Sequence, residues 1–509
     1  MRVLNSVLRF FLKLRVRQIH DYMNDPAKAQ EKWFKRLISK AQQTKWGRKY
    51  DYKTIRNIED FQQRIPISTY DEIKPYIREM MHGQANVLWP GRVHWFSKSS
   101  GTTSDKSKFL PVSYDNLNKC HLKGPHDTMA MWYHQNPKTK ILANGKGLIM
   151  GGTHNRFASY PKTHIGDVSA IILENMPFYG KYFHVPDVKT ALMQDWEGKI
   201  DIMAKIATQH NITNIGGVPT WTMILFRKLL EITGKKHILE VFPNFEVYMH
   251  GGVSFTPYRT QFRTFLPNPK VQFREIYNAS EGYFAAQYAN GEKDMLLFLD
   301  NGVFYEFVPM SELHRENPKA YTIDNVELNS NYALLISTNS GLCRYLIGDT
   351  VKFTSLKPHK IQITGRTQHF INAFGEEVTV ENTDRALANA CQQMRTSVKE
   401  YTVAPIFLSQ NGKGGHEWLI ELQHEINPQQ LTKFQTILDK ELQKVNSDYE
   451  AKRYKNMALG ELKINLIPKG AFHLWLKKKG KYGGQHKIPR LSNSRKYLEE
   501  ILTISHQLS

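Results

Sequence analysis

Residues 97–108 read S-K-S-S-G-T-T-S-D-K-S-K, within the longer stretch HWFSKSSGTTSDKSKFLPVS (94–113). Hydroxyl-bearing residues and lysines make up most of the twelve, and none has a hydrophobic side chain that could bury the stretch. Backbone N–H groups, hydroxyls and ammonium groups can together wrap a phosphate. Composition alone favours a solvated loop, whereas the position after an expected strand at 92–97 is typical of a phosphate-binding loop.

Length and composition predict a globular protein of more than one domain. The chain has 509 residues, of which 41% are hydrophobic and 12% aromatic, so it is too long for one compact core and too apolar to be disordered. The three cysteines, Cys120, Cys343 and Cys391, are far apart and form no C-x-x-C pair. This argues against a disulfide framework or a zinc site and favours a reducing, cytoplasmic location.

The chain is strongly basic, with 69 Lys and Arg against 47 Asp and Glu, a net charge of +22. This charge would attract phosphates, nucleic acid, anionic lipid or acidic small molecules, and it does not choose among them. Residues 1–20 hold five basic residues and no acid, and 469–496 hold nine and no acid. Residues 1–20 predict a basic amphipathic helix that packs on the domain or contacts a membrane surface. Because no run of 18 apolar residues occurs, we expect no membrane span and no stable membrane insertion.

The order of expected elements indicates an α/β fold. Residues 1–80 show helical spacing, and from about residue 93 short apolar runs alternate with helices. Residues 295–310 predict a hairpin around an Asp-Asn-Gly turn, and 333–355 predict a second one. A mainly antiparallel β subdomain is therefore expected around 293–365.

After residue 366 the pattern resets. Helices are expected at 379–394 and 428–453, a hairpin at 401–422, and another strand or two within 459–480. We therefore expect two domains. The larger, with mixed sheets, helices and the β subdomain, covers 1–366, and a small α+β domain covers 367–509.

Two further segments place polar side chains at expected strand ends. E-I-Y-N-A-S-E-G-Y-F (275–284) puts Tyr277 and Glu281 four residues apart; an aromatic ring can cover a nucleobase and a carboxylate can hold Mg²⁺. C-R-Y-L-I-G-D-T (343–350) puts Asp349 in a Gly-Asp turn, where it could accept hydrogen bonds from two ribose hydroxyls. Each signal is weak alone. The P-loop, dinucleotide, G-x-S-x-G and H-E-x-x-H patterns are absent from the sequence.

Taken in order, the segments resemble the motifs of the GH3 family of acyl-acid amido synthetases, within the acyl-adenylate-forming superfamily. SSGTTSDKSKFLP (99–111), IYNASEGYF (276–284) and YLIGDTVKF (345–353) resemble its three nucleotide motifs. ITGRTQHFINAFGEEV (363–378) is similar to the hinge segment, and GGQHKIPRL (483–491) to a motif near the C-terminus. The resemblance covers nearly the whole chain, and the extended basic N-terminus looks more like the microbial branch.

The resemblance implies a ligase with two half-reactions. A carboxylate attacks the α-phosphorus of ATP to give acyl-AMP and pyrophosphate, and an amine, expected to be an amino acid, then takes the acyl group. It implies ATP and Mg²⁺ as cofactors, a small carboxylic acid and an amine as partners, and a C-terminal domain that rotates about a hinge near 365–375.

The resemblance also implies roles for individual residues. The residues that would cradle the phosphates are Ser99, Ser100, Gly101, Thr102 and Thr103. Lys106 and Lys108 would neutralise pyrophosphate. Glu281 would hold Mg²⁺, and it forms the expected catalytic set with Lys108 and Lys487. Lys487 would be a mobile lysine that reaches the active site, although a solvated basic face also explains a lysine in this stretch.

The remaining expected nucleotide contacts lie on three segments. Tyr277 would stack on adenine, with Ser280 in the same motif. Gly251 and Gly252 would allow close backbone approach. Asp349 would bind the ribose hydroxyls, and Arg366 would contact ribose or phosphate.

An acyl pocket is expected between the N-terminal helices, the 120–225 region and the loop that begins at Gly251. Its candidate wall residues, which could equally be core, are Trp132, Tyr133, Trp221, Met223, Phe255 and Tyr283. Two residues depart from the family pattern: Asp105 stands where the phosphate loop usually has its second glycine, and Gln368 replaces the hinge aspartate of the acyl-CoA ligases.

Three alternatives remain open. The acyl group could pass to CoA or another thiol. Asp105 and Gln368 would also fit a family member that binds nucleotide without turnover. The net charge of +22 suggests a basic nucleic-acid-binding protein, but the ordered nucleotide motifs argue against a nucleic-acid partner.

Overall fold

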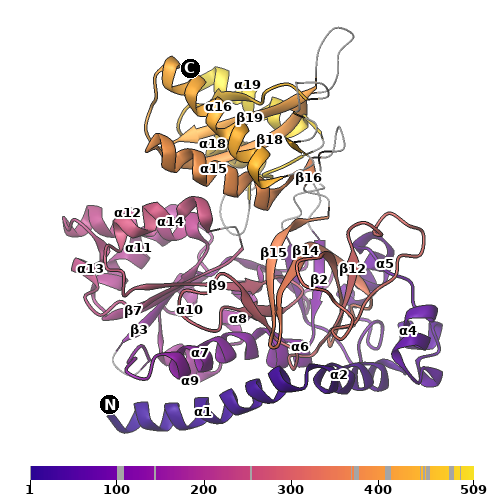
Figure 1. Cartoon of the computed structure of the whole chain (residues 1–509). Coiled ribbons are helices and arrows are strands. Elements are labelled where there is room, and N and C mark those ends of the chain that lie inside the picture. The colour runs from indigo at the N-terminus through magenta and orange to yellow at the C-terminus, as the bar shows by residue number, and fades with distance from the viewer. Residues whose placement is uncertain are drawn as a thin grey trace.

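The structure is a computed structural model. It describes residues 2–99, 108–142, 145–252, 255–367, 370–371, 376, 378–406, 414–446, 449–450, 453, 459–480, 487–492 and 494–508. A large domain forms the lower part of the molecule in Figure 1, and a smaller C-terminal domain stands above it. The predicted α/β class with two unequal domains is confirmed, whereas the expected boundary at 366–367 stays a prediction.

The N-terminal helices run along the base of the large domain and up one side of it (Figure 1). They are α1 (Arg2–Asn24), α2 (Pro26–Ala41), α3 (Lys45–Lys49), η1 (Tyr52–Thr54), α4 (Ile58–Arg64) and α5 (Tyr70–Met81). Helix α2 begins with Pro26 at its first position, after Asp25, whose side chain accepts a hydrogen bond from Lys28 N. A capping carboxylate and a proline are what a helix start favours, because the first N–H groups have no partner within the helix.

A buried ion cluster fastens α1 to α7 (Lys123–Gln135). Arg15 Nε donates to Asp127 Oδ1 at 2.7 Å, and Arg15 Nη2 lies 2.8 Å from Asp300. Lys123 contacts both carboxylates as well. Because Arg15 is 7% and Asp127 0% exposed, the interior holds these charges only as long as each keeps its partner.

An 11-stranded sheet forms the centre of the large domain. Its strands, in spatial order, are β12 (Val303–Pro309), β13 (Asn331–Thr338), β14 (Tyr345–Leu356), β15 (His359–Arg366), β11 (Met295–Leu297), β10 (Tyr283–Ala286), β9 (Gln272–Asn278), β8 (Val247–His250), β7 (Ile212–Gly217), β3 (Lys146–Ile149) and β6 (His184–Val185). The strands from β6 to β9 run parallel, and those from β9 to β12 antiparallel. The two halves therefore meet at β9.

Helices cover the parallel half of the sheet, as short βα connections require. They are α10 (Val188–Ala191), α11 (Trp196–Thr208), α12 (Pro219–Thr233), α13 (Ile238–Val241), η3 (Thr256–Tyr258) and α14 (Arg259–Phe265). The apolar faces of α11, α12, α13, η3 and α14 pack with β7, β8 and β9 in one core cluster that includes Phe226, Tyr248 and Phe262.

A smaller sheet flanks the large one, with strand order β2 (Lys108–Val112), β1 (Trp95–Ser99), β5 (His164–Gly166) and β4 (His154–Arg156). Strands β1 and β2 pair antiparallel from Trp95↔Val112 to Ser99↔Lys108. The stretch from Ser100 to Ser107 therefore connects two adjacent strands. The helices near this sheet are α6 (Tyr114–Asn116), the π-helical turn η2 (Leu117–His121) and α8 (Val168–Glu174), whereas α9 (Phe178–Tyr182) contacts β6 of the large sheet.

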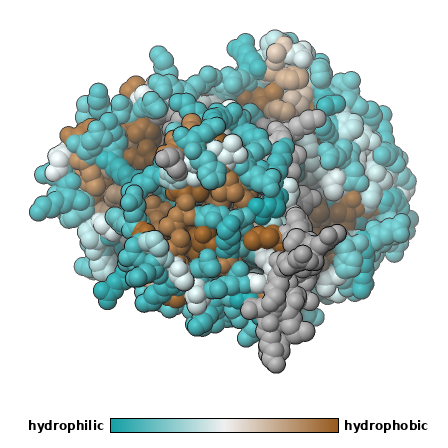
Figure 2. Space-filling model, turned by 90° about the horizontal axis from the view of Figure 1, so that it is seen from above, coloured by the Kyte–Doolittle hydropathy of each residue, from teal (hydrophilic) through white to brown (hydrophobic). Residues whose placement is uncertain are grey.

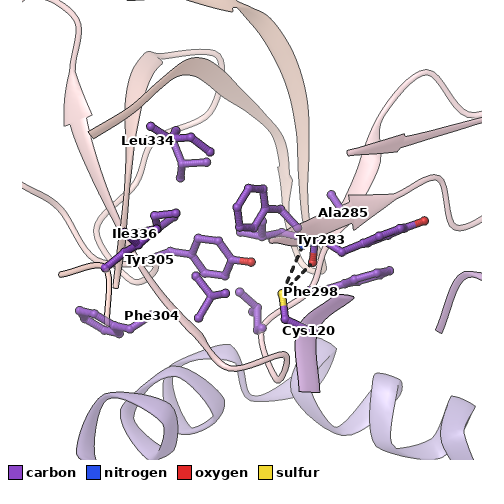
Figure 3. Close-up of a cluster of buried hydrophobic side chains, with 14 of the residues drawn as sticks. Cys120, Tyr283, Ala285, Phe298, Phe304, Tyr305, Leu334 and Ile336 are labelled. Carbon is purple, nitrogen blue, oxygen red and sulfur yellow. Dashed lines mark hydrogen bonds between the residues drawn. The ribbon is translucent and has the colours of Figure 1, made fainter. Parts of the chain in front are cut away.

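The main hydrophobic core lies between the N-terminal helices and the antiparallel half of the large sheet. Figure 3 shows part of it, with Cys120, Tyr283 and Phe298 packed together. The rings of Tyr283 and Phe298 stack at 5.9 Å, and Tyr283 N donates to Cys120 Sγ at 3.2 Å. The Tyr283 hydroxyl lies 2.9 Å from Thr128 Oγ1, so this buried phenol keeps a polar partner.

The C-terminal domain is built from two small sheets and several helices. Its elements are β16 (Phe370–Ile371), β17 (Val378–Thr379), α15 (Val380–Met394), β18 (Val398–Ile406), β19 (Gly415–Leu422), α16 (Pro428–Val445), β20 (Lys463–Leu466), α18 (Ala471–Lys478) and α19 (Lys496–Leu508). The described surface seen from above is largely hydrophilic, with separate hydrophobic patches (Figure 2). Contacts to the large domain include Arg490 Nη2 to the Tyr258 hydroxyl at 2.9 Å and Gln261 Nε2 to Val398 O at 3.3 Å.

Some predicted elements differ from the structure. The hairpin at 333–355 is confirmed as β13–β14 and that at 401–422 as β18–β19, but the hairpin at 295–310 is wrong. Its strands β11 and β12 both exist, yet β11 pairs with β10 and β15, while β12 pairs with β13. The side chain of Asn301 in this turn is buried and donates to Tyr283 O at 2.6 Å, so the turn is held by the core. Helix α16 also ends earlier than predicted, at Val445.

Candidate active site

The candidate site lies where β8 and β9 end and where β14 and β15 run beside each other. Parallel strands β7, β8 and β9 end at the same edge of the sheet, and this edge is where open α/β sheets usually bind ligands. Gly251 and Gly252 follow β8, and Ser280 and Glu281 follow β9. Segments far apart in the sequence thus meet at one edge.

Asp349 holds the centre of the cluster. In the ladder it pairs in register with Arg366, whose Nε lies 2.9 Å from Asp349 Oδ1. The Tyr277 hydroxyl on β9 donates to Asp349 Oδ2 at 2.5 Å. Both carboxylate oxygens are therefore engaged, and the side chain is held in one orientation.

Tyr277 contributes a hydroxyl contact to the site in addition to the aromatic ring on which the sequence analysis relied. Its ring is 5% exposed and packs edge-on against Phe284 at 5.0 Å. The hydroxyl, which the sequence analysis did not use, positions Asp349. The expected stacking of this ring on adenine stays a prediction.

Glu281 is a buried carboxylate at a tight turn between β9 and β10. Ala279 N donates to Gly282 O at 2.8 Å, and this closes the turn around Ser280 and Glu281. Burial raises the pKa of Glu281 to about 7, and the nearby Asp349 adds to the shift; Arg366 and Lys108 oppose it. A buried carboxylate of raised pKa gains stability from an added cation.

Lys108 begins β2 and faces the same cluster. Burial lowers the pKa of Lys108, and attraction to Glu281 partly offsets this. Its Nζ lies 5.7 Å from the centre of the Tyr70 ring, and the Tyr70 hydroxyl accepts a hydrogen bond from Phe109 N at 2.9 Å. Lys108 therefore lies within electrostatic range of Glu281, and its expected role at pyrophosphate stays a prediction.

Lys487 reaches the cluster from the C-terminal domain. Its Nζ donates to the carbonyl oxygen of Gly252. Burial lowers the pKa of Lys487 to about 8, as does repulsion from Arg366, while Asp349 raises it. This lysine therefore lies within electrostatic reach of the Asp349–Arg366 pair, which the solvated-face alternative does not predict.

The two glycines after β8 have different reasons to be glycine. A Cβ at Gly251 would lie 2.6 Å from Ile276 O, inside contact distance of the β9 backbone. Gly252 has φ +82°, a conformation that other residues rarely adopt. Both let the β8 turn pass close to β9 and to Lys487.

The remaining predicted residues divide into described and undescribed ones. Ser99 ends β1, and Ser280 is buried beside Glu281. Ser100, Gly101, Thr102, Thr103 and Lys106 lie outside the described residues, as do Asp105 and Gln368. Of the expected acyl-pocket residues, those in the buried cores are Trp132, Tyr133, Met223, Phe255 and Tyr283; Trp221 is half-buried.

Sequence reasoning missed Tyr345. This tyrosine begins β14 and is fully buried, and its hydroxyl has no hydrogen-bond partner among the described residues. Burial raises the pKa of Tyr345, and Glu281 adds to the shift. The signal was available, because Tyr345 is the first residue of the Y-x-x-G-D motif that ends in Asp349.

The residues present fit a magnesium ion shared with phosphate oxygens. Mg²⁺ usually takes one or two protein carboxylates, and the substrate's phosphates and waters complete the shell. Glu281 supplies such a carboxylate. Within the described ranges, no group of three or more His, Cys, Asp or Glu could form an all-protein metal cage.

Comparisons with known proteins agree with this arrangement. The GH3 family N-terminal domain matches residues 15–271, the central domain 296–366 and the C-terminal domain 381–496. An indole-3-acetic acid-amido synthetase, GH3.4 of Arabidopsis thaliana, is 20% identical over 93% of this chain and 90% of its own. A jasmonoyl–L-amino acid synthetase, JAR6 of Nicotiana attenuata, is 20% identical over 93% of this chain and 92% of its own.

The fold agrees as well. The structure of the GH3.15 acyl acid amido synthetase superposes with a TM-score of 0.80 at 14% identity, over 96% of this chain and 95% of that one. The three domain matches follow one another along most of the chain, in the order of the quoted motifs. The predicted resemblance is confirmed: this chain belongs to the GH3 family.

Proposed function

We propose that this protein is an ATP-dependent acyl-acid amido synthetase. It activates a carboxylic acid as acyl-AMP, with release of pyrophosphate, and transfers the acyl group to an amine, of which an amino acid is the expected case. The observation that carries the proposal is the convergence of Lys108, Arg366 and Lys487, from three distant segments, on Glu281 and Asp349.

The first half-reaction needs positive charge around the triphosphate and a fixed nucleotide. Lys108 and Lys487 supply ammonium groups, and Arg366 a guanidinium. Asp349, held by Tyr277 and Arg366, would accept hydrogen bonds from the ribose hydroxyls. Glu281 would hold Mg²⁺, which supplies charge neutralisation at the phosphate oxygens when bound.

The covalent steps balance without a redox partner. An oxygen of the substrate carboxylate forms a bond to the α-phosphorus, and the bond to the pyrophosphate oxygen breaks. The amine nitrogen then bonds to the acyl carbon, AMP leaves with the bridging oxygen, and the amine loses a proton. The Ser100–Ser107 loop would grip the leaving pyrophosphate; this role rests on the family motif.

Two finer points belong to the same proposal. The free cysteines Cys120, Cys343 and Cys391 fit a reducing cytoplasmic setting. A small acid and an amine are the proposed partners. The amide product is favoured over a thioester because the curated relatives reported above are amido synthetases.

The identity of the product shows whether the acyl group is transferred to an amine or to a thiol. Purified enzyme receives acyl-AMP together with an amino acid mixture or with CoA, and the products are identified by mass. Amide is expected, and thioester without amide would refute the acceptor assignment.

Lys487→Ala is expected to slow adenylation, whereas Lys469→Ala, in the same basic stretch, should not. Equal adenylation rates in the two variants would show that Lys487 is a solvated surface lysine with no role in the active site.

A further inference from the structure

The outward face of α1 carries an exposed hydrophobic stripe. Phe10 is 60% exposed, Phe11 61%, Val7 46% and Leu14 40%. These residues recur at three- and four-residue spacing, so they lie on one side of the helix. The two phenylalanine rings contact each other edge-on at 5.7 Å. A contiguous stripe of this kind normally has a partner.

The same side of α1 is basic. Lys13 and Arg17 are exposed one turn apart, and neither forms an ion pair with a described carboxylate. The sequence has no acidic residue before Asp21. A partner of this face should therefore be apolar beneath and negatively charged at its surface.

The inner face fixes the orientation of this stripe. Leu12, Val16 and Ile19 are buried in the main core, and Arg15 is locked to Asp127 and Asp300. The helix cannot turn to hide its phenylalanines without breaking these contacts. The exposed stripe is thus a fixed surface of the folded protein.

The position of α1 suits attachment to a flat surface. The helix runs along the base of the large domain, at the opposite end of the molecule from the C-terminal domain (Figure 1). Among the described helices, none has both the length and the hydropathy to cross a bilayer, so the contact would be peripheral.

We propose that α1 docks the protein on an anionic phospholipid surface. Phe10, Phe11, Val7 and Leu14 enter the boundary between headgroups and acyl chains, and Lys13 and Arg17 pair with lipid phosphates. Apolar burial plus attraction to anionic lipid is how amphipathic helices bind in the interfacial plane. This surface is separate from the active site, so the proposal is independent of the proposed ligase function.

Vesicle sedimentation tests the proposal with the full-length protein. The vesicles are phosphatidylcholine alone, or equal parts phosphatidylcholine and phosphatidylglycerol. The wild type should sediment with the anionic vesicles, less so at high salt. Phe10→Gln with Phe11→Gln should weaken binding at least about tenfold, and Lys13→Gln with Arg17→Gln roughly 10- to 30-fold. Leu328→Gln, which changes an exposed leucine elsewhere, is the control and should bind like the wild type.

Each other outcome overturns the proposal. Wild-type protein that stays in the supernatant with anionic vesicles excludes lipid docking. Equal binding by all variants places the lipid contact elsewhere. Light scattering on the wild type and the phenylalanine double variant gives a third outcome. A dimer that the double substitution dissociates, without vesicle binding, would make this face a contact between two copies. Circular dichroism checks that each variant is folded, and the salt dependence of the wild type needs no variant.

Discussion

The Tyr277 hydroxyl donates to Asp349 Oδ2 at 2.5 Å, across two strands separated by 72 positions in sequence. Arg366 Nε occupies the other oxygen of the same carboxylate at 2.9 Å. These contacts hold Asp349 before any nucleotide arrives, so less ordering remains for binding to complete. Three of the family motifs are thereby joined in one hydrogen-bonded unit.

Asp349→Asn should weaken nucleotide use. The asparagine amide keeps the shape of the carboxylate but loses its negative charge. That charge pairs with Arg366 and would accept hydrogen bonds from the two ribose hydroxyls. We expect an increase of about 10- to 100-fold in the KM for ATP, measured by steady-state kinetics. Tyr277→Phe should raise KM by less, about tenfold or below. A Tyr277→Phe effect on kcat alone would show that the hydroxyl does not act through Asp349.

Glu281 predicts an unusual pH dependence of stability. Its pKa is about 7 in the folded protein, above the ordinary carboxyl value, so the unfolded chain loses this proton first. Between about pH 4.5 and 7, the folded protein keeps a proton on Glu281 that the unfolded chain has already lost. The free energy of unfolding therefore falls as the pH rises through this range. Glu281→Gln should therefore be more stable than the wild type at pH 8, by on the order of 2–3 kcal/mol.

Urea unfolding across pH measures this difference. The difference in free energy of unfolding between Glu281→Gln and the wild type should shrink toward pH 4 and be largest above pH 7. The glutamine variant should gain less stability from Mg²⁺ with ATP than the wild type does. A gap that is constant with pH would contradict the raised pKa.

Gly251→Ala should destabilise the protein by about 1–3 kcal/mol, because the new methyl group meets the β9 backbone at Ile276 O. Two glycines provide matched controls. Gly216 has nothing within 4 Å and an ordinary φ, so alanine there should be nearly neutral. Gly291 has open space but φ +79°, so its alanine variant measures backbone strain alone. Thermal unfolding ranks the three; equal costs at Gly251 and Gly216 would disprove the clash.

Arg15→Met should cost about 3–5 kcal/mol, since it leaves the buried Asp127 without its main partner. Against the raising effect of burial, hydrogen bonds from Arg15 and His126 and the charge of Lys123 hold the pKa of Asp127 well below its usual range. That stabilisation is present above the ordinary carboxyl pKa and is lost as the solution becomes more acidic. The double variant Arg15→Met with Asp127→Leu should recover much of the loss in chemical denaturation. Additive losses would mean that the pair is not coupled.

The sequence predicted the residues of the site better than their contacts. Asp349, Glu281 and Lys487 were singled out by their resemblance to family motifs, and the structure places Glu281 and Lys487 within electrostatic range of Asp349. Their roles stay predictions. The sequence did not indicate the contact of the Tyr277 hydroxyl with Asp349, or that the Tyr345 hydroxyl is buried without a hydrogen-bond partner among the described residues. Both features depend on register across β9, β14 and β15, which no local pattern encodes.

The failed hairpin has the same cause. Residues 295–310 have the turn chemistry of a tight hairpin, but β15 binds one edge of β11 and β10 the other. Long-range pairing outweighed the local signal. The Arg15–Asp127 pair was also invisible in sequence, because its members lie 112 positions apart.

The central claim is that Glu281 and its neighbouring cations activate a carboxylic acid with ATP. ATP–pyrophosphate exchange across a panel of carboxylic acids tests it most directly, with the wild type, Glu281→Ala and the exposed control Glu316→Ala. We expect exchange with at least one acid. The rate should fall about 100-fold or more in Glu281→Ala and stay unchanged in Glu316→Ala. Full exchange by Glu281→Ala would contradict the account.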